Sequence, residues 1–188
     1  LVGSNPEEAH PVIGAQIRQA IQRGTQVVVV DPRKINLVKD SALHLQVQAG
    51  TNVAFANGMM HVILKEGLAD RHFIEERTEG FSDLEKMVAD YTPEKVAEIC
   101  HIHPEDLIQA ARMYAKAEKA PIIYCLGVTE HSTGTEGVMS MSNLAMLVGK
   151  VGKPGCGVNP LRGQNNVQGA CDMGCMPYDF PGYQKVNN

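Results

Sequence analysis

The apolar positions in the first part of the chain predict a helix followed by a strand. Apolar residues recur at helical spacing within residues 7–23, and Gly24 follows as a C-terminal stop. Residues 25–31 then form a short β-branched run that ends abruptly at Asp31, which is typical of a buried parallel strand. A helix followed by a strand that ends in a carboxylate indicates a Rossmann-like arrangement.

The next hundred residues predict a second strand and then mostly helices. Residues 43–47 alternate like a strand and lead into a glycine turn, after which residues 53–64 are apolar at helical spacing. The pattern then predicts a series of short helices at residues 70–77, 82–90, 92–100 and 103 or 104 to 117.

The last part of the pattern predicts a third strand, a long helix and a loop. Residues 120–126 are expected to form a second buried strand, and residues 134–149 are expected to be helical. Glycine and proline dominate residues 150–160, so a loop is expected to carry the chain to Arg162. The whole pattern predicts an α/β fold with a Rossmann-like parallel sheet flanked by helices.

Polar side chains follow the first two predicted strands. Ligands of open α/β sheets lie at the carboxyl edge of the strands, where an acidic residue commonly accepts a hydrogen bond from a ribose or a base. Asp31 is the candidate acceptor, and Arg33 is the candidate contact to a phosphate or base. A simple strand-end turn stopped by Pro32 is the alternative. Gly50 and Asn52 stand where a glycine turn enters a helix, a common place for an anion or nucleotide, and Asn52 can also cap that helix.

Residues 162–174 (RGQNNVQGACDMG) have the most unusual composition of the chain. One arginine precedes four carboxamide side chains and three glycines within thirteen residues. Carboxamides carry donors and acceptors on one planar group and suit a ligand with mixed hydrogen-bonding edges, such as a pterin or purine. The guanidinium of Arg162 can hold a small carboxylate through two parallel N–H bonds. A polar surface loop that ends in a helix cap is the alternative.

Composition narrows the class of protein. The 188 residues fit a single domain, and a 44% apolar content allows a sizeable core. A net charge of −4 without a long basic run argues against a nucleic-acid partner, and no apolar stretch approaches the roughly 20 residues that span a bilayer. A two-thiol metal site at Cys171 and Cys175 is conceivable, but structural thiols are expected and no metal ligand is assigned. The start at Leu1, without an initiator methionine, suggests an internal fragment.

Seven short strings together resemble one family along essentially the whole chain. They are residues 5–11 (NPEEAHP), 30–33 (VDPR), 49–52 (AGTN), 91–96 (YTPEKV), 127–131 (GVTEH), 143–147 (NLAML) and 162–174. In this order and spacing they resemble the molybdenum- or tungsten-dependent formate dehydrogenases of the molybdopterin oxidoreductase family. The string that begins at Arg162 resembles the sequence of this segment in the formate dehydrogenases of that family.

The resemblance implies a catalytic subunit that oxidises formate to carbon dioxide. Its cofactor would be molybdopterin guanine dinucleotide (bis-MGD) with molybdenum or tungsten, and electrons would pass to a [4Fe–4S] cluster bound by a part of the protein before Leu1. Arg162 would hold formate, and Gln164 would fix the pterin. The implied guanine-nucleotide contacts are Asn5, Glu8, Asp31, Arg33, Gly50 and Asn52. The implied pterin contacts are Leu126, Gly127 and Glu130.

The resemblance also implies how the chain is organised and what surrounds it. Residues 1–164 would form the Rossmann-like dinucleotide-binding domain, and residues 165–188 would begin a segment that returns to a neighbouring α/β domain. The implied partners are formate and electron-transfer iron–sulfur or flavin subunits or a hydrogenase, without direct membrane insertion. A cytoplasmic location is expected, with an exported form left open, and the fragment alone is expected to be inactive. The alternatives are another bis-MGD oxidoreductase, of the nitrate or sulfoxide type, and a non-catalytic cofactor-binding module.

Overall fold

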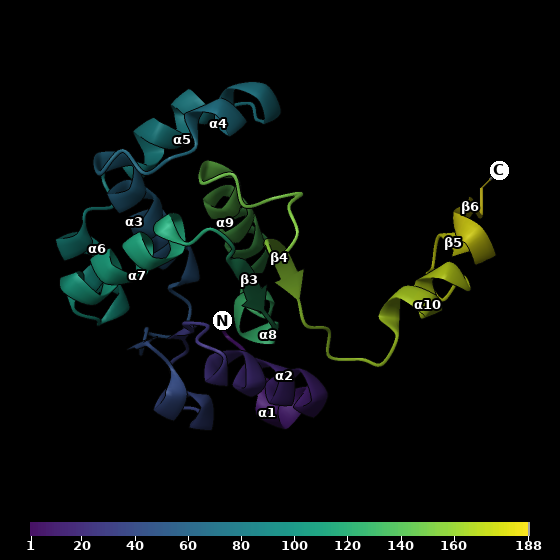
Figure 1. Cartoon of the computed structure of the whole chain (residues 1–188). Coiled ribbons are helices and arrows are strands. Elements are labelled where there is room, and N and C mark those ends of the chain that lie inside the picture. Colours follow the sequence, from purple (N-terminus) through teal and green to yellow (C-terminus); the bar gives the residue numbers. More distant parts are fainter. Residues whose placement is uncertain (188) are drawn as a thin grey trace.

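A computed structural model describes residues 1–187, and a parallel sheet lies at its centre (Figure 1). The sheet contains β1 (Val28–Val30), β2 (Leu43–Leu45), β3 (Pro121–Tyr124) and β4 (Gly157–Pro160). β1 pairs with β2 and β3 pairs with β4, both in parallel. Val2 joins the two pairs, because it forms parallel bridges to Val30 and to Tyr124. The earliest segment of the chain therefore lies in the middle of the sheet, in the order of a Rossmann half.

Helices cover both faces of this sheet. The α-helices of the body are α1 (Pro6–Ala9), α2 (Pro11–Gln22), α3 (Asn52–Lys65), α4 (Arg71–Arg77), α5 (Phe81–Val88), α6 (Pro93–Cys100), α7 (Pro104–Lys116), α8 (Leu126–Thr129) and α9 (Gly134–Leu147), and η1 (Asn36–Asp40) is a 3₁₀ helix. On one face, Val29 packs in a small cluster with residues of α2 and η1. On the other face, Val30 belongs to the main core with α3, α7 and α9. Successive residues of β1 thus serve opposite faces, as expected for a strand buried on both sides.

The main core is built around α3. Phe55, Met60 and Ile63 of this helix are fully buried and pack with Leu107 of α7 and Met141 of α9. A Cβ atom at Gly58 would lie 2.8 Å from a methyl group of Val96 in α6, so this glycine lets two helices approach closely. No helix within residues 1–187 is long and apolar enough to cross a membrane.

The α/β prediction is confirmed, and most predicted elements end within three residues of their observed bounds. The single helix predicted for residues 7–23 is wrong at its start, because the chain breaks into α1 and α2 at His10, whose φ is −140°. Pro11 explains the break. Its ring disfavours the helical conformation in the residue before it, and it has no N–H to continue the first helix.

Two further predictions at the edge of the sheet are wrong. Residues 150–160 are not a continuous loop, because β4 occupies the second half and pairs along the whole length of β3. Asn159 and Pro160 of this strand are exposed, and an edge strand tolerates proline because its outer side needs no ladder hydrogen bond. Leu126 does not extend β3, which ends at Tyr124; it begins α8 instead.

Beyond β4 the chain leaves the body of the fold. Figure 1 shows this last segment standing apart from the sheet. It contains α10 (Val167–Asp172), the antiparallel pair β5 (Asp179–Phe180) and β6 (Gln184–Lys185), and η2 (Pro181–Tyr183). Hydrogen bonds of Asp172 with Gln168 and Tyr183 tie the segment together. The domain boundary at residue 164 stays a prediction, and Asn188 lies outside the described residues.

The ion pair between Glu66 and Arg112 should make stability depend on pH. Arg112 donates to both carboxylate oxygens at 2.7–2.9 Å and thereby joins the end of α3 to α7. These bonds lower the pKa of the Glu66 carboxyl in the folded protein. The stabilisation is therefore present above the unfolded pKa, near 4.3, and is lost as the pH falls through the folded pKa. Glu66→Gln should lower the melting temperature by about 1 to 3 °C at pH 7, and this difference should vanish at low pH.

Thermal melts of the purified protein over a pH series would check this prediction. Asp83→Asn is the matched control, because Asp83 forms a largely exposed pair with Lys86 at 3.5 Å and its replacement should lower the melting temperature less than Glu66→Gln does. A Glu66→Gln difference that stayed constant with pH would contradict the assignment to this ion pair.

Candidate functional site

Two glycines meet backbone to backbone at the centre of the carboxyl edge of the sheet. Gly3 directly follows Val2, the residue that joins the two strand pairs, and Gly127 lies in α8, just after β3. The Gly127 N–H donates to the Gly3 carbonyl at 3.1 Å. A Cβ atom on either residue would lie 2.6 Å from backbone atoms of the other, so neither position admits a side chain without a backbone shift. The strand order reverses between these two segments, which is where open α/β sheets bind ligands.

A cavity of about 220 Å³ opens beside this glycine contact. Among the predicted site residues it is lined by Asp31, Arg33, Gly50, Asn52 and Gly127. It is also lined by residues that the sequence did not single out as contacts, including Gly3, Gln48 and His131. Three loops that follow parallel strands therefore converge on one hollow, together with the N-terminus of α3.

Asp31 and Arg33 form the wall of the cavity at the end of β1. Asp31 is only 3% exposed, and its Oδ1 accepts a hydrogen bond from the backbone N–H of Arg33 at 2.8 Å. The Arg33 guanidinium is 3.7 Å from the same oxygen, yet 65% of its side chain is exposed. His44 of β2 donates to the Asp31 carbonyl at 3.1 Å. A buried carboxylate is thus held rigidly while the arginine beside it can reach a ligand.

Asn52 does not cap α3, so the capping expectation is wrong. Thr51 takes the capping position, and Asn52 is the first helical residue. Its Nδ2 donates to the Gly127 carbonyl at 3.0 Å, and the His131 Nε2 lies 3.0 Å from the same oxygen. An aspartate could not make the first of these bonds, because a carboxylate has no donor. Asn52 therefore ties the helix behind the cavity to the glycine contact.

Buried polar atoms without partners lie directly after the central segment. The side-chain oxygens Oγ of Ser4 and Oδ1 of Asn5 are buried and lack a hydrogen-bond partner among residues 1–187. An unmade buried hydrogen bond costs about 1 to 3 kcal/mol, so such atoms favour a ligand that supplies donors. The N–H groups of a guanine or pterin are donors of this kind, so these residues fit a ligand that carries such groups. Ser4 and Asn5 do not line the cavity themselves, but they directly follow Gly3, which does.

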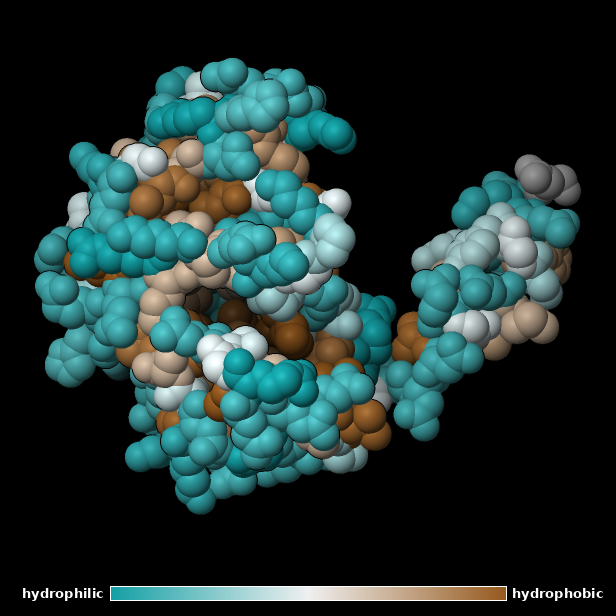
Figure 2. Space-filling model, in the orientation of Figure 1, coloured by the Kyte–Doolittle hydropathy of each residue, from teal (hydrophilic) through white to brown (hydrophobic). Residues whose placement is uncertain are grey.

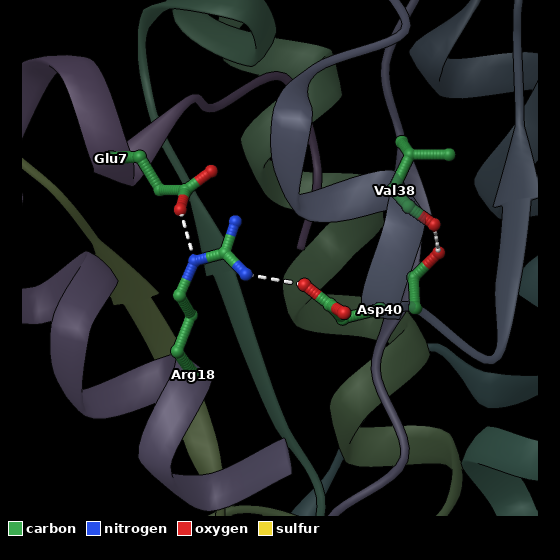
Figure 3. A network of polar contacts seen from close by, with 5 residues as sticks. Glu7, Arg18, Val38 and Asp40 are labelled. Carbon is green, nitrogen blue, oxygen red and sulfur yellow. Dashed lines mark hydrogen bonds and ion pairs between the residues drawn. The ribbon is translucent and has the colours of Figure 1, made fainter. Parts of the chain in front are cut away.

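A charged network holds together the loops that carry these residues. Arg18 of α2 pairs with Glu7 of α1 and with Asp40 of η1, as Figure 3 shows. The hydrogen bond to Glu7 is the main cause that raises the pKa of Arg18 above its ordinary value, and Asp40 adds to it. α1 directly follows Asn5 and η1 closely follows Arg33, so one guanidinium fixes both loops.

Arg162 lies outside this cavity, where the chain leaves β4. Three hydrogen bonds hold the backbone there. The Leu161 N–H donates to the Tyr124 carbonyl at 2.8 Å, Cys125 Sγ donates to the Leu161 carbonyl at 2.8 Å, and the His10 Nε2 contacts the Arg162 carbonyl at 2.6 Å. Burial raises the pKa of the Tyr124 phenol, and the charge of Arg162 acts in the opposite direction.

The remaining predicted residues are also exposed outside the cavity. Glu8 lies on α1, Leu126 belongs to α8, Glu130 follows α8, and Gln164 follows Arg162 on the segment that leaves the body. Residues 1–187 contain no group of three or more His, Cys, Asp or Glu side chains that could hold a metal ion. The structure therefore brings together half of the predicted cofactor contacts, buries Asn5 outside the cavity, and leaves Glu8, Leu126, Glu130 and Gln164 at its surface.

Gly3 and His131 were missed for different reasons. Gly3 follows only two residues of its strand, so no periodicity marked a strand end; the sequence Val2-Gly-Ser-Asn5, with its small polar residues, was the available signal. His131 ends the string at residues 127–131, but nothing in the sequence marks its ring as part of the cavity. Its place is evident once α8 folds back and brings its ring to the Gly127 carbonyl.

Fold and site define a Rossmann-like α/β unit with a binding cavity at the point where the strand order reverses. A family model described as molybdopterin oxidoreductase matches residues 1–187. The chain belongs to the molybdopterin oxidoreductase family, which confirms the resemblance.

Individual relatives agree with this family. The chain is 50% identical over all 188 residues to the F420-dependent formate dehydrogenase subunit alpha of Methanocaldococcus jannaschii, and covers 28% of that protein. It is 47% identical over 186 residues to formate dehydrogenase H of Escherichia coli, covering 99% of this chain and 26% of that protein. The solved structure of acetylene hydratase from Pelobacter acetylenicus matches with a TM-score of 0.73 and 27% identity over 76% of this chain and 20% of that one. The chain thus spans little more than a quarter of these curated relatives.

Replacement of Gly127 should disturb the site directly. Gly127→Ala places a Cβ atom 2.6 Å from the Gly3 backbone, and overpacking of this kind costs about 1 to 3 kcal/mol. We expect a lower melting temperature and less retained pterin in the full-length protein. Gly163→Ala is the matched control for the melting temperature alone, because its Cβ atom would meet only a Leu126 methyl group, at 3.7 Å. A melting temperature and a pterin content of Gly127→Ala equal to those of the wild type would show that the glycine contact is not required.

Proposed function

We propose that this chain is part of the catalytic subunit of a formate dehydrogenase that oxidises formate to carbon dioxide. The observation that carries the proposal is the identity of about one half, along the whole chain, to relatives named as formate dehydrogenase subunits. The cavity at the reversal point of the sheet, lined by the buried carboxylate of Asp31 and by Arg33, supports a role in holding the cofactor of this family. Because the chain covers about a quarter of those relatives, other parts of the protein would complete the active site.

The cavity would hold the guanine-nucleotide part of a bis-MGD cofactor. The fixed carboxylate of Asp31 suits the N–H groups of a base or the hydroxyls of a ribose, and the exposed guanidinium of Arg33 suits a phosphate. Gly50 has φ +86° and open space where a Cβ atom would stand, so the backbone can approach a ligand closely. Asn5 and Glu8 would contact the nucleotide from the other side, and Asn52 would act mainly by fixing the Gly127 peptide.

The pterin would lie along the edge formed by α8. Leu126 and Gly127 begin this helix, and Glu130 follows its end. Gln164, with donors and acceptors on one amide, would pair with the pterin ring edge from the segment after β4. The cofactor metal, molybdenum or tungsten, would supply a place for the two electrons that formate releases when it becomes carbon dioxide and a proton.

Arg162 would bind and orient the formate carboxylate. Two hydrogen bonds hold Leu161 at the end of β3 and one holds the carbonyl of Arg162, whereas the Arg162 side chain is exposed. A planar guanidinium can give two parallel hydrogen bonds to one carboxylate and so set the direction of the C–H bond. Electrons would leave through a [4Fe–4S] cluster elsewhere in the protein to iron–sulfur or flavin subunits or a hydrogenase.

Substitution of Arg162 tests the substrate site. In the full-length, metal-loaded enzyme, Arg162→Lys should lower kcat/KM for formate-dependent dye reduction at least about tenfold. The lost charge-assisted hydrogen bond is worth about 1.5 to 3 kcal/mol, and a lysine cannot make the two-pronged contact. Arg23→Lys is the control, since Arg23 is exposed at the end of α2, away from the site. Equal activity of Arg162→Lys and wild type would still support a formate dehydrogenase but would contradict the assignment of Arg162 as the residue that binds formate.

The same assay separates the alternatives. A wild-type enzyme that contains cofactor but reduces no dye with formate would favour another reaction of the family, and nitrate or a sulfoxide would then be tried as oxidant. A protein that binds cofactor and turns over none of these substrates would favour a non-catalytic cofactor-binding module.

Substitution of Asp31 tests the nucleotide site. Asp31→Asn keeps the oxygen that accepts from the Arg33 N–H but removes the charge, so we expect roughly tenfold weaker retention of the guanine dinucleotide. Guanine nucleotide released on denaturation, measured per mole of purified full-length protein, is the readout. Asp90→Asn, on the exposed surface after α5, should retain the wild-type amount. Full retention in Asp31→Asn would exclude the carboxylate from the nucleotide contact.

A further inference from the structure

His10 joins the first turn of the fold to the candidate substrate residue. It lies between α1 and α2, and its Nε2 is 2.6 Å from the carbonyl oxygen of Arg162, 152 positions later in the chain. A carbonyl oxygen only accepts, so the imidazole donates through Nε2. The other ring nitrogen, Nδ1, is buried and has no hydrogen-bond partner among residues 1–187. The contact to Arg162 is therefore the one hydrogen bond of this ring within that range.

The His10 contact is the last anchor before the chain leaves the body. Leu161 is held by Tyr124 and Cys125 at the end of β3, and Arg162 is held by His10. Within the described part of the chain, no hydrogen bond ties residues 163–187 to the body. Figure 1 shows the chain running away from the sheet beyond this point. Without His10, the peptide that carries the guanidinium would be fixed on its N-terminal side alone.

We propose that His10 is a positioning residue that fixes the Arg162 peptide and thereby aims its guanidinium at the substrate carboxylate. The proposal rests on the proposed function of Arg162. His10 also connects the two proposed parts of the site. The helix α1 begins directly after Asn5, a proposed nucleotide contact, and His10 follows the end of α1 and contacts Arg162, the proposed substrate residue. Orientation of a binding group matters strongly for rate, since a shift of about 1 Å can cost on the order of a hundredfold.

The test compares His10→Ala with His10→Gln in the full-length, metal-loaded enzyme. Alanine removes the donor, whereas the terminal amide of glutamine can place an N–H near the position of the imidazole Nε2. His72→Ala is the control, because His72 is an exposed residue of α4 that pairs only with Glu76. Hydrogen–deuterium exchange of the peptide that covers residues 161–164 reports the anchor without any reference to activity.

We expect this peptide to exchange at least about fivefold faster in His10→Ala and close to the wild-type rate in His10→Gln. Formate kcat/KM should fall about fivefold to tenfold in His10→Ala, mainly through KM, and recover to within about threefold in His10→Gln, with unchanged cofactor content. The control should match wild type in all three measurements.

Three results with the variants would overturn the proposal, and one with the wild type would remove its basis. Unchanged exchange in His10→Ala would show that the ring does not hold this peptide. Faster exchange with unchanged formate kinetics would show that the anchor does not position the substrate. Equal loss of cofactor in both His10 variants would assign the residue to folding alone. A wild-type enzyme without formate activity would remove the proposed function and this role with it, while the exchange data would still report the anchor separately.

Discussion

The backbone contact between Gly3 and Gly127 is the constraint on which the rest of the site depends. It brings the middle segment of the sheet within hydrogen-bond distance of the turn after β3. No side chain can stand between them, because a Cβ atom on either residue would be 2.6 Å from the other backbone. The side chains of Asn52 and His131 both contact the Gly127 carbonyl, so this one peptide links the start of α3 to α8 and the residues after it. The cavity lies beside this glycine contact.

Rigidity around the cavity comes from polar bonds between loops rather than from the apolar core. The core of α3, α7 and α9 lies behind the sheet and supports the strands. The loops at the carboxyl edge are fixed by the Arg18 network and by the bond from Asp31 to the Arg33 N–H. The face in Figure 2 is mostly hydrophilic around a hollowed apolar region. Loops that are fixed in this way keep polar groups available, whereas apolar packing would bury them.

The sequence predicted the elements better than the contacts between them. Helical periodicity located α3 to α7 closely, and the polar end of β1 pointed to Asp31. β4 was missed because its pairing with β3 is set by backbone hydrogen bonds, which composition does not reveal. Asn52 stands where the sequence predicts a helix cap, but its side-chain amide donates to a carbonyl 75 residues away. The convergence of Asp31, Gly50 and Gly127 on one cavity follows from strand order, a property of the whole sheet.

The separation of the cavity from Arg162 bears on how one fold supports different reactions. The chain shares its fold with a structure named acetylene hydratase, at a TM-score of 0.73, so the sheet by itself does not determine the reaction. The cavity is built by the sheet and its helices, whereas Arg162 and Gln164 lie on a segment that joins the body through backbone hydrogen bonds at residues 161 and 162. Side chains on that segment can change without disturbing the strands. Under the proposed function, substrate specificity would vary on that segment while the cavity proposed for the cofactor stays the same.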